Sequence, residues 1–271
     1  MGVELHYTVA AQTDAGTVRK INQDSLTVKV AGTAYGEAAI AIICDGMGGL
    51  EQGEVASATV AKTFEQWFLK DFPPLLESGI TAARLERIWG HMINRCNERM
   101  YAYSKKQNTT MGTTLTMLLL TGGCYYIAHV GDCRVYKMRE DIWQMTTDQT
   151  YVAREVALGH MTTEQAKNDM RRNVLLQCIG TGKTITPDFM NGYVMPGESY
   201  LLCSDGFRNE LSEKELYEQC HNGLFSLSWC VANRMENSHI MNQQLKQLIE
   251  LDKQRKEKDN ISVILIKAMS K

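Results

Sequence analysis

Two aspartate–glycine pairs, far apart in the chain, each close an apolar run and could bring carboxylates together. Residues 38–44 run apolar into Asp45-Gly46, and residues 199–202 run apolar toward Asp205-Gly206. A short apolar run closed by a turn signal is typical of a buried strand, so both pairs are expected to place an aspartate at a strand end. Carboxylates grouped at strand ends suit hard divalent cations, which take oxygen ligands.

An ordinary turn is the alternative for each pair, because Asp-Gly is the commonest hairpin turn pair. It explains the two pairs together less well. Asp45-Gly46 is followed by more glycine and small residues and not by a second short strand. A glycine beside each aspartate also allows backbone and ligand to approach closely. The cation interpretation is favoured, and the turn stays open for either pair alone.

Other charged residues lie beside predicted strands. Asp132 follows a glycine at a strand end, and Asp259 precedes a closing strand at 261–266. Arg19 and Asp24 lie in a dense polar stretch just before the Asp45 strand. A solvated surface pair is the alternative for these two residues, because such pairs are common and contribute little.

The elements that must position these residues are strands interrupted by helices. Strands are predicted near 6–12 and 25–30. A helix is predicted from Glu54 until Pro73-Pro74 ends it, and Thr81 opens a second helix with one apolar stripe. Two consecutive helices between strands indicate a layer that covers one face of a sheet. Short runs joined by short turns from 115 to 145 then predict antiparallel strands, because parallel strands need long crossovers.

The segment from Thr147 to Thr184 is less regular than its surroundings. Asp148 is predicted to cap a short helix through Leu158, and Thr162 with Gln165 resembles a capping box. The segment lies between two strands that are expected to face the site, so it is a candidate flap. An ordinary surface excursion is the alternative.

Two further strands follow, and the second leads to Asp205. Ser212 with Glu215 is another capping box, and residues 225 to about 256 are helical in character. Ile261 to Ile266 form a closing strand that is rich in β-branched residues.

Length and composition are those of a globular protein with one domain, residues 1–271. Its 44% hydrophobic and 22% charged residues argue against disorder, and its net charge of -2 gives no nucleic-acid footprint. Eight scattered cysteines without a C-x-x-C pair are typical of free thiols in a reducing compartment. No stretch approaches the roughly 18 apolar residues of a membrane span. We therefore expect a cytoplasmic protein with no nucleic-acid or membrane partner.

Seven short blocks of these residues occur in a fixed order: Arg19 with Asn22 to Ser25, Asp45 to Gly49, Gly53 to Ser57, Gly112 to Thr114, His129 to Arg134, Leu201 to Gly206, and Asp259 to Val263. Each block alone is weak evidence. The full set resembles the metal-dependent serine/threonine protein phosphatases, the protein phosphatase 2C family, and its bacterial members most closely. The likeness runs from Thr13 to Ile266, nearly the whole chain.

The resemblance implies an α+β fold, a four-layer α-β-β-α sandwich with two central antiparallel sheets. It also implies two Mn²⁺ or Mg²⁺ ions in the cleft between the sheets, and a weaker third ion. By the family pattern, Asp45 bridges the two ions, and Asp205 and Asp259 complete the coordination of the first ion. The Gly46 carbonyl helps to hold the second ion, and Asp24 supports the water shell of that ion. Asp132 contributes to the third ion.

The implied catalytic residues are Arg19, Asp45 and Asp205, with Arg19 gripping the substrate phosphate. A water shared by two cations about 4 Å apart loses its proton near neutral pH and becomes the nucleophile. This hydroxide attacks phosphorus in line, while the cations and the guanidinium offset the charge on the phosphoryl oxygens. The implied activity is hydrolysis of phosphoserine and phosphothreonine in a phosphoprotein. It implies a signalling role opposite a cognate Ser/Thr protein kinase.

Four positions depart from the family pattern. Gln23 stands where many members carry a glutamate ligand, and Asn209 stands where an acidic ligand of the third metal is common. Met47 occupies the place of a histidine that eukaryotic relatives use near the leaving group, which leaves the general acid unassigned; a metal-bound water is one candidate. Cys133 replaces the usual serine after Asp132, and we expect this to be a packing change.

Two other functions compete with catalysis. A phosphatase-like module could recognise phosphoproteins without turning them over, and the departures at the metal positions favour it. The retained Asp45, Asp205 and Asp259 outweigh those departures. A nucleotide phosphate loop at Gly46 to Gly49 is disfavoured, because such a loop needs a lysine and a serine or threonine in fixed spacing and Leu50-Glu51-Gln52 supplies neither.

Overall fold

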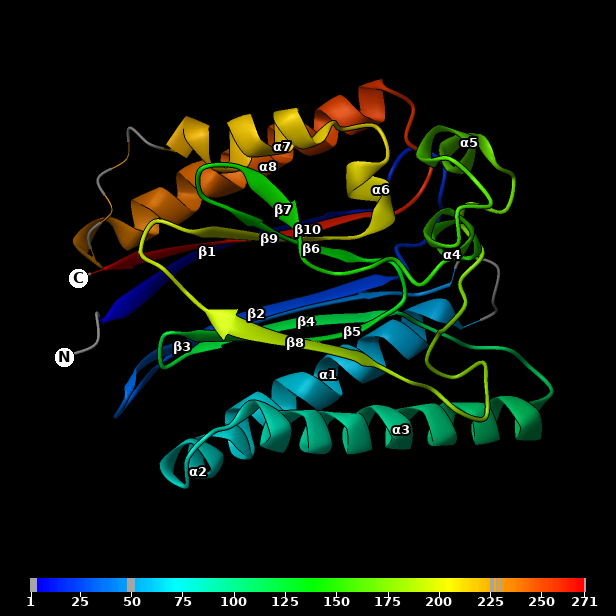
Figure 1. Cartoon of the computed structure of the whole chain (residues 1–271), viewed down its shortest axis with the longest axis horizontal. Coiled ribbons are helices and arrows are strands. Elements are labelled where there is room, and N and C mark those ends of the chain that lie inside the picture. Colours follow the sequence, from blue (N-terminus) through cyan, green and yellow to red (C-terminus); the bar gives the residue numbers. More distant parts are fainter. Residues whose placement is uncertain (1–3, 48–51, 225–226, 228, 230, 271) are drawn as a thin grey trace.

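The computed structural model of the chain describes residues 4–47, 52–224, 227, 229 and 231–270. In this part of the chain two five-stranded sheets lie face to face, with helices on both outer sides (Figure 1). Every pair of neighbouring strands is antiparallel. The predicted four-layer α-β-β-α sandwich with two antiparallel sheets is therefore confirmed.

The strands follow a different order in each sheet than in the sequence. The first sheet has the order β1-β10-β9-β6-β7, with β1 at Leu5–Asp14, β10 at Ile261–Ser270, β9 at Ser199–Cys203, β6 at Arg134–Met138 and β7 at Ile142–Gln144. The second sheet has the order β2-β3-β4-β5-β8, with β2 at Asp24–Thr33, β3 at Gly36–Asp45, β4 at Leu115–Thr121, β5 at Cys124–Val130 and β8 at Asp188–Tyr193.

The helices form two outer layers and one end of the molecule. The second sheet is covered by α1 at Gly53–Lys70, α2 at Phe72–Glu77 and α3 at Ala82–Gln107 (Figure 1). The first sheet is covered by α7 at Glu213–Cys220 and α8 at Arg234–Gln254, with the short α6 at Asp205–Arg208 nearby. Among the described helices, none combines the length and apolar character that crossing a bilayer requires.

Three apolar cores fill the three interfaces between these layers. One core joins α1 and α3 to the second sheet, one joins α7 and α8 to the first sheet, and the third lies between the two sheets. The strand β3 contributes to two of them: even-numbered residues 38–44 face the helices, and odd-numbered residues 39–43 face the other sheet. Burial on both faces explains why residues 38–44 of this strand are all apolar.

Three predicted helix starts are confirmed. The Thr81 side chain accepts a hydrogen bond from the backbone N–H of the third residue of α3. Thr162 with Gln165 and Ser212 with Glu215 each form a complete capping box, in which both reciprocal hydrogen bonds are present.

Three other predicted helix boundaries are wrong. Thr150, not Asp148, caps the helix α4, because the Asp148 carboxylate is held by two arginines instead. Pro73-Pro74 lies in the first turn of α2, where a missing N–H costs little, so these prolines begin a second short helix. The long helix α8 begins only at Arg234; residues 225, 226, 228 and 230 lie outside the described residues.

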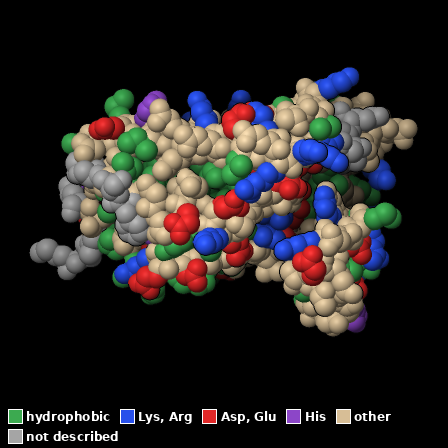
Figure 2. All heavy atoms as spheres, turned by 90° about the horizontal axis from the view of Figure 1, so that it is seen from above, with side chains coloured by type: hydrophobic (Ala, Val, Ile, Leu, Met, Phe, Trp, Pro, Cys, Tyr) green, Lys and Arg blue, Asp and Glu red, His purple; other side chains and the backbone are tan. Residues whose placement is uncertain are grey.

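The segment 147–184 forms a lobe at one end of the sandwich (Figure 1). It contains α4 at Tyr151–Ala157 and α5 at Thr163–Asn168. A β-bridge between Thr150 and Leu175 joins its two sides. Figure 2 shows this lobe projecting from a body whose visible face carries interspersed acidic and basic side chains.

Candidate active site and metal centre

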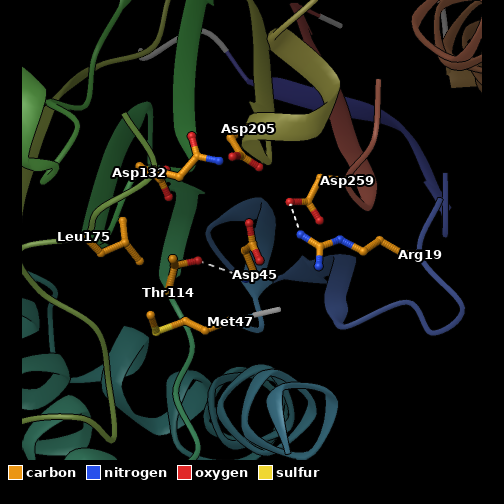
Figure 3. A pocket seen from close by; sticks show the side chains of 9 residues that line it. Arg19, Asp45, Met47, Thr114, Asp132, Leu175, Asp205 and Asp259 are labelled. Atoms are coloured by element: carbon orange, nitrogen blue, oxygen red, sulfur yellow. Dashed lines mark hydrogen bonds and ion pairs between the residues drawn. The ribbon is translucent and has the colours of Figure 1, made fainter. Parts of the chain in front are cut away.

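A pocket with a volume of about 370 Å³ gathers most of the predicted site residues (Figure 3). Its lining residues are Arg19, Asp45, Met47, Thr114, Asp132, Asn173, Leu175, Asp205 and Asp259. The four aspartates in this set come from four separate segments of the chain. The fold thus brings together residues that are up to 240 positions apart in the sequence, as Arg19 and Asp259 are.

Each of the four aspartates lies at or close to the end of a regular element. Asp45 is the last residue of β3, and Asp132 lies in the turn between β5 and β6. Asp205 is the first residue of α6, directly after β9, and Asp259 lies just before β10. Because side chains alternate along a strand, Asp45 continues the face of β3 that is turned toward the other sheet.

The backbone of Asp45 is fixed by two consecutive threonines. The Asp45 N–H donates to the Thr114 Oγ1 at 2.9 Å, and the Thr114 N–H donates to the Asp45 carbonyl at 2.9 Å. The Thr113 hydroxyl donates to the same carbonyl at 2.9 Å. In the sequence these threonines were noted only as part of the Gly112 to Thr114 block, so their positioning of Asp45 is an additional finding.

The glycines after the two aspartates are required by close backbone packing. A Cβ atom at Gly46 would collide with the carbonyl oxygen of Gly53, and a Cβ atom at Gly206 would collide with the carbonyl oxygen of Asn260. The Gly46 N–H also donates to the Gln23 carbonyl at 3.1 Å. Both glycines are thus needed because another backbone segment packs closely against them. From the sequence alone, a ligand was expected to approach the backbone there.

Asp24 and Gly46 do not line the pocket themselves. Asp24 lies directly opposite Asp45 in the β2–β3 ladder, so both side chains project from the same face. Asp24 is 8% exposed and lies beside Asp45 on the neighbouring strand, and the supporting role that the resemblance implies for it stays a prediction.

Burial and mutual repulsion disfavour the charged form of these carboxyl groups. Burial, followed by the charges of neighbouring aspartates, raises the pKa of Asp45 well above its ordinary value. Burial is also the largest cause that raises the pKa of Asp24 and of Asp132, each to about 7. The pKa of Asp205 is raised too, again chiefly by burial.

The residues present fit divalent cations. Both carboxylate oxygens of Asp24 and Oδ1 of Asp205 are buried without a hydrogen-bond partner among the described residues. Buried carboxylates of this kind are costly unless a positive charge compensates them. An all-oxygen donor set is the kind that Mg²⁺ and Mn²⁺ prefer.

The carboxylates share the pocket without forming a finished coordination sphere. No three His, Cys, Asp or Glu side chains of the described chain are grouped closely enough to hold one ion. That these carboxylates hold divalent cations together stays a prediction from the resemblance.

Arg19 reaches the pocket, and its partner there is a carboxylate. The Arg19 Nη2 donates to Asp259 Oδ2 at 2.8 Å, shown as a dashed line in Figure 3. Both side chains are partly exposed, at 39% and 30% respectively. This hydrogen bond is the largest cause that raises the pKa of Arg19. The guanidinium carries further N–H donors that this ion pair does not use.

Asn260 positions the loop that carries Arg19, and the sequence did not single it out. Its Oδ1 accepts a hydrogen bond from the Gln23 N–H at 2.9 Å. Its Nδ2 donates to the carbonyls of Ala15 and Ile21 at 3.0 and 3.2 Å. The only signal in the sequence was its place in the Asp259 to Val263 block.

Asn173 and Leu175 are further pocket residues that sequence reasoning missed. Both belong to the lobe 147–184, so this lobe contributes directly to the wall of the pocket. An asparagine and a leucine in an irregular segment carry no periodicity that could have identified them.

The four departures from the family pattern occupy distinct places. Met47 lines the pocket, and its sulfur lies 2.9 Å from the Cys178 sulfur. Gln23 lies outside the lining and donates from Nε2 to the Glu54 carboxylate at 3.1 Å. Cys133 is fully buried beside the Thr114 hydroxyl, which agrees with a packing change. Asn209 follows α6, and its N–H donates to the Asp205 carbonyl at 3.0 Å.

Comparison with known proteins points in one direction. The family model described as Protein phosphatase 2C matches residues 14–250. The serine/threonine protein phosphatase PstP of Mycobacterium tuberculosis is 32% identical over 219 residues, which cover 80% of this chain and 39% of PstP. The serine/threonine phosphatase stp of Listeria innocua is 32% identical over 211 residues, which cover 76% of this chain and 80% of stp.

A solved structure supports the same likeness at the level of the fold. The catalytic domain of PstP in complex with two manganese ions superposes with a TM-score of 0.75. It is 26% identical, and the match covers 98% of this chain and 100% of that domain. The chain therefore corresponds to the catalytic part of PstP and spans 39% of the length of the full protein.

Proposed function

This chain belongs to the protein phosphatase 2C family, and from that premise we propose that it hydrolyses phosphoserine and phosphothreonine in proteins. The observation that carries the proposal is the gathering of Asp45, Asp132, Asp205 and Asp259 in one pocket with Arg19. No contact of the described residues favours the alternative, a module that binds phosphoproteins without turnover.

The proposed cofactors are two Mn²⁺ or Mg²⁺ ions, with a weaker third ion at Asp132. Asp45, Asp205, Asp259 and the Gly46 carbonyl would hold the two ions, and Asp24 would support them from behind Asp45. Ions held there would supply Lewis-acid chemistry, which would lower the pKa of water in the pocket and favour its attack on phosphorus.

The chain's own residues bind and orient the phosphoryl group in this proposal. The substrate phosphate enters the pocket beside Arg19, whose N–H groups match the geometry of phosphoryl oxygens. An oxygen from water forms a bond to phosphorus, and the bond between phosphorus and the serine or threonine oxygen breaks in line with it. The products are inorganic phosphate and the protein with a free serine or threonine hydroxyl group.

The leaving oxygen must take up a proton, and Met47 cannot provide one. A thioether has no titratable proton, and Cys178 beside it is a buried thiol whose pKa burial raises to about 12. We propose that the proton comes from water in the pocket.

The substrate, the partner kinase, the extent of the domain and the compartment are also proposals. The substrate would be a phosphoprotein, and a cognate Ser/Thr protein kinase would produce it. The residues 1–271 would form one phosphatase domain, in which the lobe 147–184 acts as a flap through Asn173 and Leu175. The free cysteines of the described chain support a reducing compartment, the cytoplasm.

The proposal is tested by hydrolysis of para-nitrophenyl phosphate and of a phosphothreonine peptide, with Mn²⁺ and with a chelator. We expect turnover only with the metal, and a loss of about a hundredfold or more in Asp205→Asn, since electrostatic stabilisation is usually the largest catalytic effect. Isothermal titration should show weaker Mn²⁺ binding in the same variant.

Asp71→Asn is the matched control, because Asp71 is exposed and its side chain makes no capping hydrogen bond. Unchanged Mn²⁺ binding and turnover in Asp205→Asn would refute the assignment. Phosphopeptide binding without turnover in the presence of Mn²⁺ would instead support the binding module.

A further inference from the structure

Arg208 is a buried cation beside the pocket, and the proposed reaction gives this residue no role. It is the last residue of α6, the helix that begins with Asp205, and its side chain is 13% exposed. Its Nη2 donates to the backbone carbonyl of Asp132 at 3.2 Å and to Asp148 Oδ2 at 3.3 Å. One guanidinium therefore contacts the turn that carries Asp132 and the base of the lobe 147–184.

Asp148 is a fixed anchor for this contact because a second arginine holds it. The Arg134 Nε and Nη2 donate to its two oxygens at 2.8 and 2.7 Å. Burial alone would raise the pKa of Asp148, but the hydrogen bonds from Arg134 and the charges of Arg208 and Arg134 hold it below its ordinary value. The carboxylate is thus ionised at neutral pH, and its two partners are oriented by charge-assisted hydrogen bonds.

The base of the lobe is also joined to the Asp132 turn through the backbone. The Gln149 N–H donates to the Gly131 carbonyl at 2.8 Å, and the Gly131 N–H donates to Gln149 Oε1 at 2.9 Å. Gly131 has a φ of 110°, and a Cβ atom there would lie 2.7 Å from the Thr114 Cβ. This turn therefore has little freedom to move apart from the lobe.

The charge of Arg208 also faces two pocket carboxylates. Arg208 ends the four-residue helix that Asp205 begins, and its Nη2 lies 3.2 Å from the backbone carbonyl of Asp132. No ion pair within 4.0 Å joins Arg208 to either carboxylate in the described structure, so its charge lies near them without pairing with them.

From these contacts we propose that Arg208 is a positioning residue of the phosphatase reaction, which couples the lobe 147–184 to the Asp132 turn and to Asp205 at the start of its own helix. The inference rests on the proposed phosphatase function. Arg208 does not line the pocket, so it acts on substrate only through these residues. Movement of the lobe, which carries Asn173 and Leu175, would then move the Asp132 carboxylate as well.

The test compares Arg208→Met, Arg208→Lys and wild type in steady-state hydrolysis of para-nitrophenyl phosphate with Mn²⁺. We expect Arg208→Met to lower kcat about tenfold, the change expected from losing buried hydrogen bonds to a charged group. KM should change much less, because Arg208 does not reach the pocket surface. Arg208→Lys should recover part of kcat, since it keeps the charge and the donors.

Amide hydrogen exchange of residues 147–158 provides the second readout. Exchange there should be faster in Arg208→Met and also in Asp148→Asn, which removes the anchoring charge while keeping the side-chain shape. Arg234→Met is the matched control, since Arg234 pairs with Glu37 at 2.6 Å and lies outside the pocket lining. It should lower the melting temperature but leave kcat and lobe exchange unchanged.

The proposal is overturned if Arg208→Met behaves like this control, with a lower melting temperature but wild-type kcat and wild-type exchange in the lobe. It is also overturned if Asp148→Asn leaves the exchange of the lobe unchanged. Absence of Mn²⁺-dependent turnover in the wild type would refute the phosphatase function alone, because the exchange experiment measures the coupling without catalysis.

Discussion

Single residues show which part of the site a sequence can reveal. Asp45 and Asp205 were predicted because each interrupts an apolar run, and burial of such a carboxylate needs a reason. Asn260 gave no comparable signal, because its three hydrogen bonds go to a loop near the other end of the chain. A local pattern reveals a residue that breaks it, and it does not reveal a residue whose partners come from the tertiary fold.

Replacing Asn260 tests its positioning role. Asn260→Ala removes the hydrogen bonds that hold the Arg19 loop, so we expect KM for para-nitrophenyl phosphate to rise about tenfold, with a smaller change in kcat. Steady-state kinetics measure both quantities. Asn191→Ala is the control, because Asn191 is exposed on β8, and its kinetics should match the wild type. A fall in kcat at constant KM would contradict this role.

At the scale of elements, strands and helix starts were predicted better than the irregular segment. Apolar runs and capping boxes depend on neighbours in sequence, and so residues 199–202 and Ser212 with Glu215 were close to the observed β9 and α7. Asp148 was wrongly expected to cap α4, because both Asp148 and Thr150 are suitable capping types and only the fold brings Arg134 to Asp148.

The cap of α4 can be tested directly. The Thr150 hydroxyl accepts a hydrogen bond from the Ala153 N–H at 3.2 Å, so Thr150→Ala should destabilise this helix by about 1 kcal/mol. Amide hydrogen exchange in residues 151–157 should become faster by the factor that corresponds to this loss of free energy. Thr59→Ala, at an exposed position within α1, should not change exchange in α4. Equal exchange in both variants would mean that Thr150 is not the cap.

At the scale of the whole molecule, several poorly compensated carboxylates are gathered at one place. The sequence has a net charge of only -2, yet several buried aspartates share one end of the sandwich. Composition could not predict this concentration, because it depends on how the two sheets align their strand ends. The cost of these charges must be offset elsewhere or by bound cations, which ties the stability of the fold to its metal content.

This cost predicts how stability depends on pH and on Mn²⁺. In the cation-free protein Asp24 and Asp132 have pKa values of about 7, whereas an unfolded aspartate has about 3.9. Between these values the folded state retains protons that the unfolded state has released. The contribution of these two groups to stability is therefore full below about pH 4 and is lost as the pH rises toward 7.

With a chelator present, the melting temperature should accordingly decrease as the pH is raised from 5 to 8. Mn²⁺ binds the ionised carboxylates, so its stabilising effect should be largest at pH 8, at about 2.7 kcal/mol for a concentration one hundred times Kd. The double variant Asp24→Asn with Asp132→Asn should show a flatter pH dependence in chelator. A chelator-treated wild type that melts higher at pH 8 than at pH 5 would disagree with the raised pKa values.

The pairing of β1 with β10 has a consequence for how the protein is made. Leu5 lies opposite Ser270, and β10 is the strand that separates β1 from β9 in the first sheet. During synthesis β1 cannot pair with β10 until the residues that separate the two strands in the sequence have been made. Such long-range pairing slows folding and leaves an apolar strand exposed in the meantime. Newly made chains should therefore depend on chaperones until β10 inserts between β1 and β9.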